Sequence, residues 1–367
     1  EKLEAGGKKI IHFELGEPQF DTPKNIVDAA IKSLQNGDTH YVNSYGKYSL
    51  REIVQDTTFQ SRGFKPDINQ ILITPGANAI IFLAMSCLVN HGDEVIIPDP
   101  GFPTYISTAQ FIGAKIVKVP LREENAFRLS PDDLLSKITS KTKLIIINSP
   151  SNPTGSLIKS EDLIEIAKIA EDKDIYLLTD EVYARMVFGE PEKFFSIGLY
   201  DACKKRTIIA NGFSKAFAMT GWRLGVAIGP VDVIEKMMLV LQTIHSCVPP
   251  FIQEGGIEAI RGDKSGLKLM MEAYKKNRDY LVESLNLIKG ITCLKPDGAI
   301  YVFANIKGTG MSSEVFSDYL LNECGIAVLP GNNFGDFGEG YIRLSYTISI
   351  DLIKEAIEKM KIALGTK

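Results

Sequence analysis

Lys215 and Arg223 stand eight positions apart in the segment 211–225, Asn-Gly-Phe-Ser-Lys-Ala-Phe-Ala-Met-Thr-Gly-Trp-Arg-Leu-Gly. A lysine in such a small, glycine-bounded turn can condense with an aldehyde to form an imine. An arginine nearby can hold a phosphate through two parallel hydrogen bonds. The pair therefore predicts a site for a small molecule that carries both an aldehyde and a phosphate. Because most lysines are solvated surface charges, the prediction needs support from other segments.

Asp180 follows the apolar run at residues 175–179, which predicts a buried strand. Ligands of open α/β sheets bind at the carboxyl ends of such strands. Pyridoxal 5'-phosphate (PLP) combines an aldehyde with a phosphate, and its ring nitrogen needs an acid so that the protonated ring can accept electrons. Asp180 is the candidate for that acid. Taken alone, an aspartate that caps the next helix is an equally good interpretation.

The sequence resembles the class I aminotransferases, which are aspartate-aminotransferase-like, PLP-dependent enzymes of fold type I. It is most similar to their bacterial-type aspartate aminotransferase branch. Residues 211–225 resemble the family motif S-x-S-K-x-F-x-M-x-G-x-R-x-G, except that Gly212 stands where many relatives carry a serine. Residues 180–183 resemble its D-E-x-Y, and residues 148–155 match its N-x-P-x-N-P-T-G. The resemblance extends from about residue 11 to residue 364.

The resemblance implies a role for each matching residue. Lys215 would bind the PLP aldehyde, and Asp180 would meet the ring nitrogen. Asn152 and Tyr183 would meet the 3-oxygen of the ring. Lys215, Asp180 and Tyr183 are therefore the expected catalytic group. Phe102, in Pro-Gly-Phe-Pro, would lie over the ring, for which an aromatic face is suited.

A phosphate site is expected at Gly76-Ala77-Asn78, where a predicted strand leads into a predicted helix. Exposed amides at a helix N-terminus bind phosphate well. The resemblance implies that the amides of Ala77 and Asn78 hold the PLP phosphate, with Ser214 and Arg223 nearby. The glycine at position 212 puts one further side-chain contact to the phosphate in doubt.

Tyr41 begins a segment that resembles the family's Y-x-x-x-x-G-x-x-x-L-R, which here runs to Arg51. In the family this tyrosine crosses a dimer interface to the phosphate of the neighbouring subunit. We therefore expect a homodimer with shared active sites. Tyr45 is the competing assignment, but its spacing to the glycine differs from the motif.

Two segments are expected to bind substrate. Arg343 lies in the apolar run Tyr-Ile-Arg-Leu-Ser-Tyr and resembles the family's arginine for the α-carboxylate. Its fork of N–H donors matches a carboxylate geometrically. Gly16 would add a backbone amide to the same carboxylate, and Asn152 would contact the substrate as well as the cofactor. The segment 330–335, Pro-Gly-Asn-Asn-Phe-Gly, also fits the family's loop before that arginine.

The elements that must position these residues follow from hydrophobic periodicity. Helical patterns at 77–90 and 161–172 alternate with short apolar runs, which predicts a parallel sheet with helices on both faces. The expected strands are residues 71–74, 94–98, 115–120, 143–148, 175–179, 207–210 and 224–228.

Beyond about residue 230 the pattern becomes mixed. Helices are expected at 231–245, 251–261, 264–287 and 352–364, with short strands at 291–294, 299–305, 327–329 and 341–345. The predicted fold class is α/β. It is the PLP-dependent transferase fold type I, with a mostly parallel central sheet flanked by helices in a large domain, plus a smaller α+β domain from both termini. The expected bounds are 46–285 for the large PLP-binding domain and 1–45 with 286–367 for the small domain.

Composition excludes several classes of protein. The chain has 367 residues, 45% of them hydrophobic, and a formal net charge of −4. Without a basic excess there is no indication of a nucleic-acid partner, and the longest apolar runs are too short to cross a bilayer. The five cysteines form no Cys-x-x-Cys pair, so we expect no metal site and reduced thiols in a cytoplasmic protein.

The resemblance implies transamination, in which an L-amino acid gives its amino group to a 2-oxo acid by a ping-pong mechanism. Lys215 would move the α-proton as general base and acid. Arg343 and Arg223 would hold the two ends of the reacting molecule at fixed geometry. Glutamate and 2-oxoglutarate are an expected pair.

Two alternative functions use the same cofactor. A PLP-dependent C–S lyase, which catalyses β-elimination, would need the same cofactor residues. A non-catalytic PLP-binding regulator is less expected, because no basic helix-turn-helix segment is visible. In aspartate-using relatives a lysine often stands at the position of Asn78 and a small hydroxyl residue at that of Glu14. Both differences weaken the case for a dicarboxylate, and aspartate, alanine, aromatic and branched substrates stay open.

Overall fold

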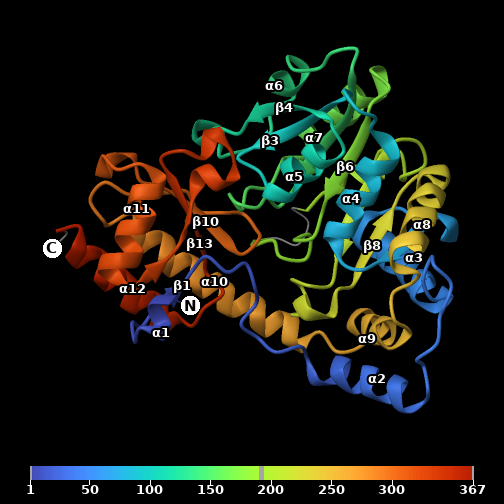
Figure 1. The fold of residues 1–367 in the computed structure, drawn as a ribbon, viewed down its shortest axis with the longest axis horizontal. Helices are drawn as coiled ribbons and strands as arrows, with labels where there is room; N and C mark the ends of the chain where they lie inside the picture. Colours follow the sequence, from blue (N-terminus) through green and yellow to red (C-terminus); the bar gives the residue numbers. More distant parts are fainter. Residues whose placement is uncertain (1, 190–193, 366–367) are drawn as a thin grey trace.

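The computed structural model describes residues 2–189 and 194–365. A twisted sheet forms its centre, with helices on both faces (Figure 1). The strand order is β2-β8-β7-β6-β5-β3-β4. The strands are β2 (Ile71–Thr74), β3 (Glu94–Asp99), β4 (Lys115–Pro120), β5 (Thr142–Asn148), β6 (Tyr176–Asp180), β7 (Thr207–Gly212) and β8 (Gly225–Ile228).

The sheet is mostly parallel, which confirms the predicted fold class, but β8 departs from the expectation of a parallel strand. Strands β4, β3, β5, β6 and β7 pair in parallel, whereas β8 runs antiparallel to both β7 and β2. The segment 213–224 that joins β7 to β8 contains no crossover helix. A short connection between neighbouring strands must reverse the chain, so β8 returns antiparallel.

Strand β5 shows why the sheet needs a layer of helices on each face. Leu144 and Ile146 point into one hydrophobic cluster, whereas Ile145 and Ile147 point into another, and all four are fully buried. A strand that is buried on both faces has a continuous apolar run rather than alternation. Helices α4 (Ala77–Leu88), α5 (Pro103–Phe111) and α8 (Val231–His245) cover the first face, and α7 (Ser160–Asp172) covers the second.

Three further helices complete the second face and the edge of this unit: α3 (Tyr48–Arg62), α6 (Pro131–Leu135) and α9 (Pro250–Arg261). Helix α2 (Lys24–Gln35) lies against α9 (Figure 1). No described helix is long and apolar enough to span a membrane.

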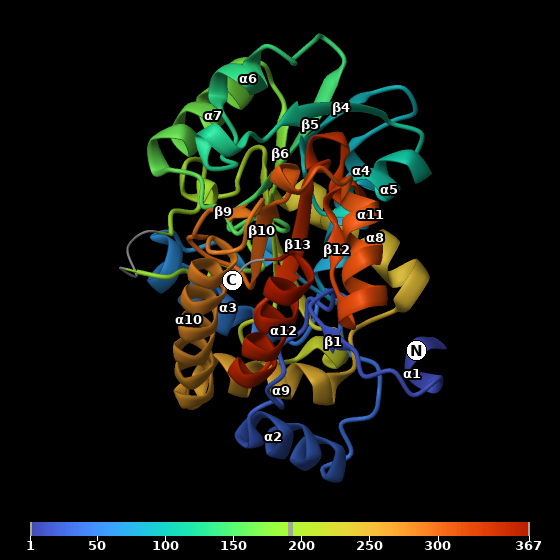
Figure 2. The same ribbon diagram turned by 90° about the vertical axis from the view of Figure 1, so that its left-hand side faces the viewer.

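Both ends of the chain meet in a second unit (Figure 2). Its antiparallel sheet has the order β12-β13-β10-β9, with β9 (Thr292–Cys293), β10 (Tyr301–Asn305), β12 (Leu329–Pro330) and β13 (Tyr341–Ser345). A separate parallel pair joins β1 (Ile11–His12) to β11 (Ile326–Ala327). The helices are α1 (Lys2–Ala5), α10 (Ser265–Leu285), α11 (Ser313–Tyr319) and α12 (Ile350–Ala363).

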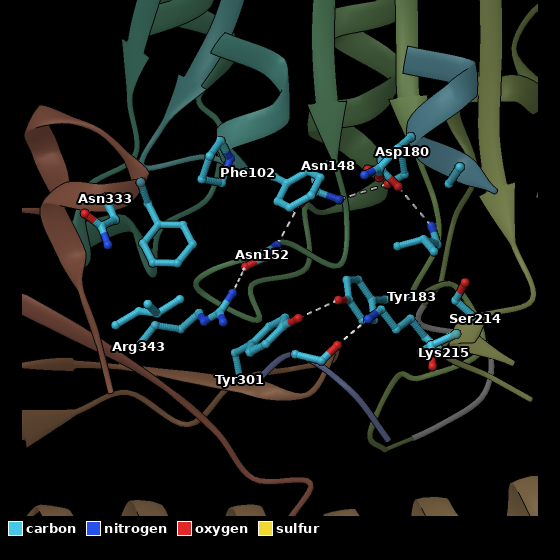
Figure 3. Close-up of a pocket in the computed structure, with 18 of the residues that line it drawn as sticks. Phe102, Asn148, Asn152, Asp180, Tyr183, Ser214, Lys215, Tyr301, Asn333 and Arg343 are labelled. Atoms are coloured by element: carbon cyan, nitrogen blue, oxygen red, sulfur yellow. Dashed lines mark hydrogen bonds between the residues drawn. The ribbon is translucent and has the colours of Figure 1, made fainter. Parts of the chain in front are cut away.

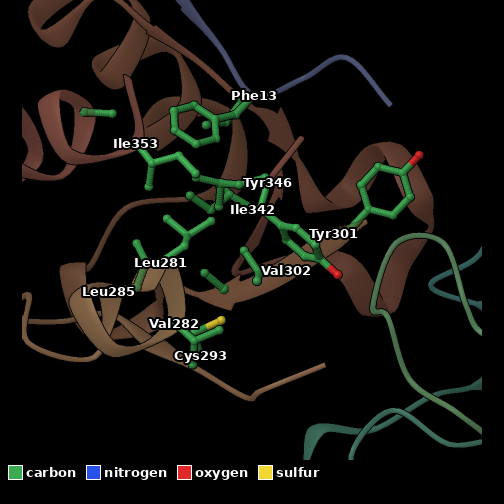
Figure 4. Packing of buried hydrophobic residues seen from close by; sticks show 14 of the residues in the cluster. Phe13, Leu281, Val282, Leu285, Cys293, Tyr301, Val302, Ile342, Tyr346 and Ile353 are labelled. Carbon is green, nitrogen blue, oxygen red and sulfur yellow. The ribbon is translucent and has the colours of Figure 1, made fainter. Parts of the chain in front are cut away.

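One hydrophobic cluster holds this second unit together (Figure 4). Phe13 from the N-terminal segment packs there with Leu281 of α10, Ile342 of β13 and Ile353 of α12. Helix α10 packs in this cluster up to Leu285, although the expected limits assign residues up to 285 to the large domain. The domain limits 46–285 and 1–45 with 286–367 stay a prediction. The single strand expected at 327–329 is in fact split, because β11 and β12 belong to different sheets.

A buried ion pair fixes α3 to the carboxyl end of β6. Arg62 Nε donates to Glu181 Oε2 at 2.7 Å, and the two side chains are 7% and 2% exposed. Ser196 Oγ donates to the other carboxylate oxygen, Oε1, at 2.5 Å. Glu181 follows Asp180 directly, so the pair also positions the residue that ends β6.

We expect Arg62→Met to lower the free energy of unfolding by about 3–5 kcal/mol, because it leaves the Glu181 carboxylate buried without its cation. Lys24→Ala is the control, because Lys24 and Asp28 form an exposed pair on α2 whose loss should cost less than about 0.5 kcal/mol. Urea unfolding of both variants measures the difference. Equal losses in the two variants would show that the Arg62 pair contributes no more than a surface contact.

Candidate active site

The large cavity of about 650 Å³ lies between the carboxyl ends of the parallel strands and the second unit (Figure 3). Asn148 ends β5 and Asp180 ends β6, whereas Arg343 comes from β13 on the opposite side. Open α/β sheets place their ligands at this edge. Predicted site residues that line the cavity are Gly16, Ala77, Asn78, Phe102, Asn152, Asp180, Tyr183, Ser214, Lys215, Arg223 and Arg343.

Asp180 places a buried carboxyl group at one end of the cavity. Burial raises its pKa to about 6, although the hydrogen bonds from Tyr105 and the Val182 amide act in the opposite direction. The Tyr105 hydroxyl donates to Oδ2 at 2.7 Å, and the Val182 amide donates to Oδ1 at 3.2 Å. A buried carboxyl group of this kind favours a proton or a cationic ligand beside it.

Lys215 enters the cavity from the segment after β7. Its Nζ donates a hydrogen bond to the backbone oxygen of Gly16, so the amine is held between the two units. The charge of Lys215 also acts on Asp180 and lowers the pKa of that carboxyl group, which is a minor effect beside burial. The cavity therefore contains an amine and an acid that influence each other electrostatically.

The N-terminus of α4 and Arg223 form a positively charged corner. Arg223 has a φ of 53°, which a residue with a side chain rarely adopts. This turn brings its guanidinium against Gly76, where an added Cβ would lie 2.4 Å from Nη2. Ala77 and Asn78 follow in the first turn of α4, where backbone amides lack helical partners. Free amides beside a guanidinium can bind a phosphate.

Gly212 has space for a side chain. An added Cβ would lie 3.5 Å from the Leu224 oxygen and 3.6 Å from the Ala77 Cβ, which are ordinary contact distances. The absence of a serine at this position is therefore not imposed by crowding. A hydroxyl group there would lie beside the first turn of α4.

Arg343 forms the opposite end of the cavity. Its Nη1 donates to Asn152 Oδ1 at 3.0 Å, and its Nη2 donates to the Glu14 backbone oxygen at 2.6 Å. The guanidinium lies over the rings of Tyr301 and Phe334, at 4.2 and 4.9 Å from their centroids. Its Nε is buried without a hydrogen-bond partner, and among residues 2–189 and 194–365 no carboxylate pairs with this arginine. A carboxylate ligand would supply the missing charge.

Several residues that line the cavity were missed by the sequence analysis. Asn148 accepts from the Asn152 amide at 2.7 Å and donates to the Asp180 backbone oxygen at 3.1 Å, and its place in the motif could have indicated it. Tyr301 meets the Tyr183 hydroxyl at 2.9 Å and comes from β10, where no sequence pattern marks it. Leu329 also lines the wall, whereas Asn333 and Phe334 lie in the loop 330–335 that the family resemblance had already indicated. Tyr105 does not line the wall itself but donates a hydrogen bond to Asp180.

Three residues that the sequence analysis named do not line the cavity of the single chain. Tyr41 is 87% exposed and does not line it. The Glu14 carboxylate is bound to His12, whose Nδ1 lies 2.7 Å from Oε1, and it does not line the cavity either. Gly76 lies behind Arg223 rather than in the wall itself.

Comparisons with known proteins agree on the family. Residues 8–360 match the family described as aminotransferase class I and II. An aspartate aminotransferase of Pyrococcus horikoshii is 43% identical, with 97% of this chain and 90% of the relative covered. Aromatic-amino-acid aminotransferase 2 of Thermococcus litoralis is 40% identical, with 100% and 94% covered.

Solved structures agree as well. The crystal structure of an aromatic aminotransferase from Pyrococcus horikoshii superimposes with a TM-score of 0.94 at 38% identity, over 97% of this chain and 96% of that one. These relatives do not favour the lyase alternative, because each of them carries an aminotransferase name. The chain is an enzyme that belongs to the class I and II aminotransferase family.

Proposed function

We propose that the large cavity binds PLP and that the enzyme passes the amino group of an L-amino acid to a 2-oxo acid by a ping-pong mechanism. One observation carries the proposal: the same cavity is lined by a buried acid, an amine and an arginine that pairs with no carboxylate in the described part of the chain. These are the groups that Asp180, Lys215 and Arg343 contribute. Bound PLP would supply an aldehyde for the amine and a ring that draws electrons away from the substrate α-carbon.

The donor set fits this cofactor. Asp180 would hold a proton on the ring nitrogen, because a buried carboxylate is stabilised by a cation beside it. The first amides of α4, Ser214 and Arg223 would hold the phosphate. Phe102 would cover one face of the ring, and Tyr183 and Asn152 would meet the 3-oxygen.

Substrate would be held at the other end. Arg343 would grip the α-carboxylate with its two-pronged donor group, and Gly16 and Asn152 would complete that contact. Lys215 Nζ would take the proton from the substrate α-carbon and hold it for the return transfer, as general base and acid. The arginines at the two ends would keep this transfer at fixed geometry.

The proposal also covers the identity of the amino donor and of the 2-oxo acid acceptor. Glutamate and 2-oxoglutarate are the pair we propose first, with aspartate, alanine or an aromatic amino acid as partner. A relative named for aspartate and one named for aromatic amino acids have nearly the same sequence identity to this chain. The amide of Asn78 offers no charge to a distal carboxylate, whereas the bond to His12 keeps the Glu14 acid out of the wall. Amino donors tested against 2-oxoglutarate and pyruvate would identify the pair.

Exposure of Tyr41 supports a homodimer in which this tyrosine reaches the phosphate of the neighbouring subunit. A separate groove has Phe20, Ile31 and Leu34 in its lining, and these side chains are 42–46% exposed in the single chain. Exposed apolar surface of this kind favours burial against another subunit.

Lys215→Ala should lower transamination by about 10²–10⁴-fold, because Lys215 is the one amine among the described residues that line the cavity. Lys24→Ala on the exposed face of α2 should keep full activity. Formation of the 2-oxo acid measures both, and borohydride followed by mass spectrometry should locate PLP on Lys215 in the parent enzyme. Full activity of Lys215→Ala would exclude the proposed role. Pyruvate and ammonia released from a sulfur amino acid, without transamination, would indicate the lyase.

Asp180→Asn should stabilise the PLP-free protein at pH 8 but not at pH 4. The folded-state pKa of about 6 lies above the ordinary value of 3.8, so the folded protein binds the extra proton between these values. Stability therefore falls as pH rises through this window, by about 3 kcal/mol in total. The variant lacks this penalty. Urea midpoints from pH 4 to 8 test the difference, and a variant that is less stable than the parent at pH 8 would contradict it.

Sedimentation of the purified protein should give the mass of a dimer. Tyr41→Phe should keep the dimer but weaken PLP binding several-fold, because only the hydroxyl contact to the neighbouring phosphate is lost. Tyr48→Phe, at another exposed tyrosine, is the matched control. A fully active monomer would exclude the role of Tyr41 across subunits.

A further inference from the structure

A second, much smaller cavity of about 50 Å³ lies behind the segment that carries Lys215. Phe213 and Phe217 of this segment line the small cavity, whereas Lys215 lines the large one. Val182 lines both, so the two cavities are neighbours. A molecule in the small cavity would contact the back of the segment that presents the amine.

Arg62 lines this cavity and carries one unsatisfied hydrogen-bond donor. Its side chain is only 7% exposed and lies at the end of α3. Nε donates to Glu181 and Nη1 to Ser61 Oγ at 3.0 Å. Nη2 is buried, and no described residue accepts a hydrogen bond from it. A buried donor without a partner is costly, so the local packing leaves the guanidinium of Arg62 incompletely satisfied.

Arg185 lines the same cavity from an exposed turn. Its Nη2 donates to Thr57 Oγ1 at 3.0 Å, and Thr57 also lines the cavity. Desolvation, and then the charge of Arg62, lower the pKa of the Arg185 guanidinium. Within the described residues Arg185 forms no ion pair, and the carboxylate of Glu181 is already bound to Arg62 and Ser196. Two guanidinium groups therefore line this cavity, and among the described residues only that of Arg62 pairs with an acid.

The remaining wall is largely apolar, and its residues include Val54, Val226, Ile228 and Ile260. A volume of about 50 Å³ admits only a few non-hydrogen atoms. Large or multiply charged anions would lose too much hydration there. A small carboxylate-type oxyanion fits, since its oxygens match the guanidinium donors and it brings a single charge.

We propose that this cavity binds a small monovalent oxyanion of the carboxylate type, such as acetate, formate or bicarbonate, between Arg62 and Arg185. The anion relieves the repulsion between the two arginines that line the cavity. It also packs against the back of the Lys215 segment and stiffens it. The site is separate from the proposed substrate site at Arg343 and does not depend on the identity of the cofactor.

Acetate is the probe, and sodium gluconate, a carboxylate too bulky for the cavity, replaces it at equal ionic strength. The Tm of the purified enzyme should rise saturably with acetate, by roughly 2 °C at ten times Kd. Equilibrium dialysis should find a binding site for labelled acetate that survives Arg343→Gln, because that variant removes only the carboxylate site of the large cavity.

Two variants test the small cavity itself. Arg185→Gln removes one guanidinium, and Val54→Ile fills the space without changing charge, so both should abolish the saturable response. Arg261→Gln removes an exposed positive charge that lies next to Ile260 but outside the cavity, and should keep the response. Loss of acetate binding in Arg343→Gln, an equal response to gluconate, or an unchanged response in both Arg185→Gln and Val54→Ile would overturn the proposal.

Discussion

The buried carboxyl group of Asp180 is the constraint on which the site depends. It ends β6 in the middle of the sheet, where water cannot solvate its charge. Without a ligand it can keep that position at neutral pH only with the support of Tyr105 and the Val182 amide. A ring nitrogen that carries a proton would supply the missing positive charge. Burying the Asp180 carboxylate therefore costs free energy in the PLP-free protein, and the proposed cofactor would remove that cost.

At the far end of the cavity, Arg343 is a buried positive charge that pairs with no carboxylate among the described residues. Arg343 is only 5% exposed, and its guanidinium rests on two aromatic rings, with backbone and amide oxygens as its hydrogen-bond partners. Buried charges without an ion-pair partner are rare unless a ligand completes them. Two such charges facing each other across one cavity orient a molecule that is cationic at one end and anionic at the other. Lys215 lies between them, where a proton would have to move.

Sequence patterns were enough for the residues that stand at strand ends and in fixed motifs. Asn152, Asp180, Lys215 and Arg343 were identified in this way, and all line one cavity. Contacts between residues that are distant in the sequence have no such local signal. Tyr105 and Tyr301 reach Asp180 and Tyr183 from elements 75 and 118 positions away, and nothing local marks them. The direction of β8 and the split near residue 328 depend on pairing between strands, which local periodicity does not encode.

The most direct test of the central claim is the protonation state of the ring nitrogen in the bound cofactor. Nitrogen-15 NMR of the enzyme loaded with ring-labelled PLP can follow this nucleus from pH 6 to pH 9. If a protonated ring nitrogen balances the charge of the Asp180 carboxylate as we propose, the nitrogen stays protonated throughout this range in the parent enzyme and loses its proton in Asp180→Asn. An unprotonated ring nitrogen in the parent enzyme at neutral pH would contradict the account.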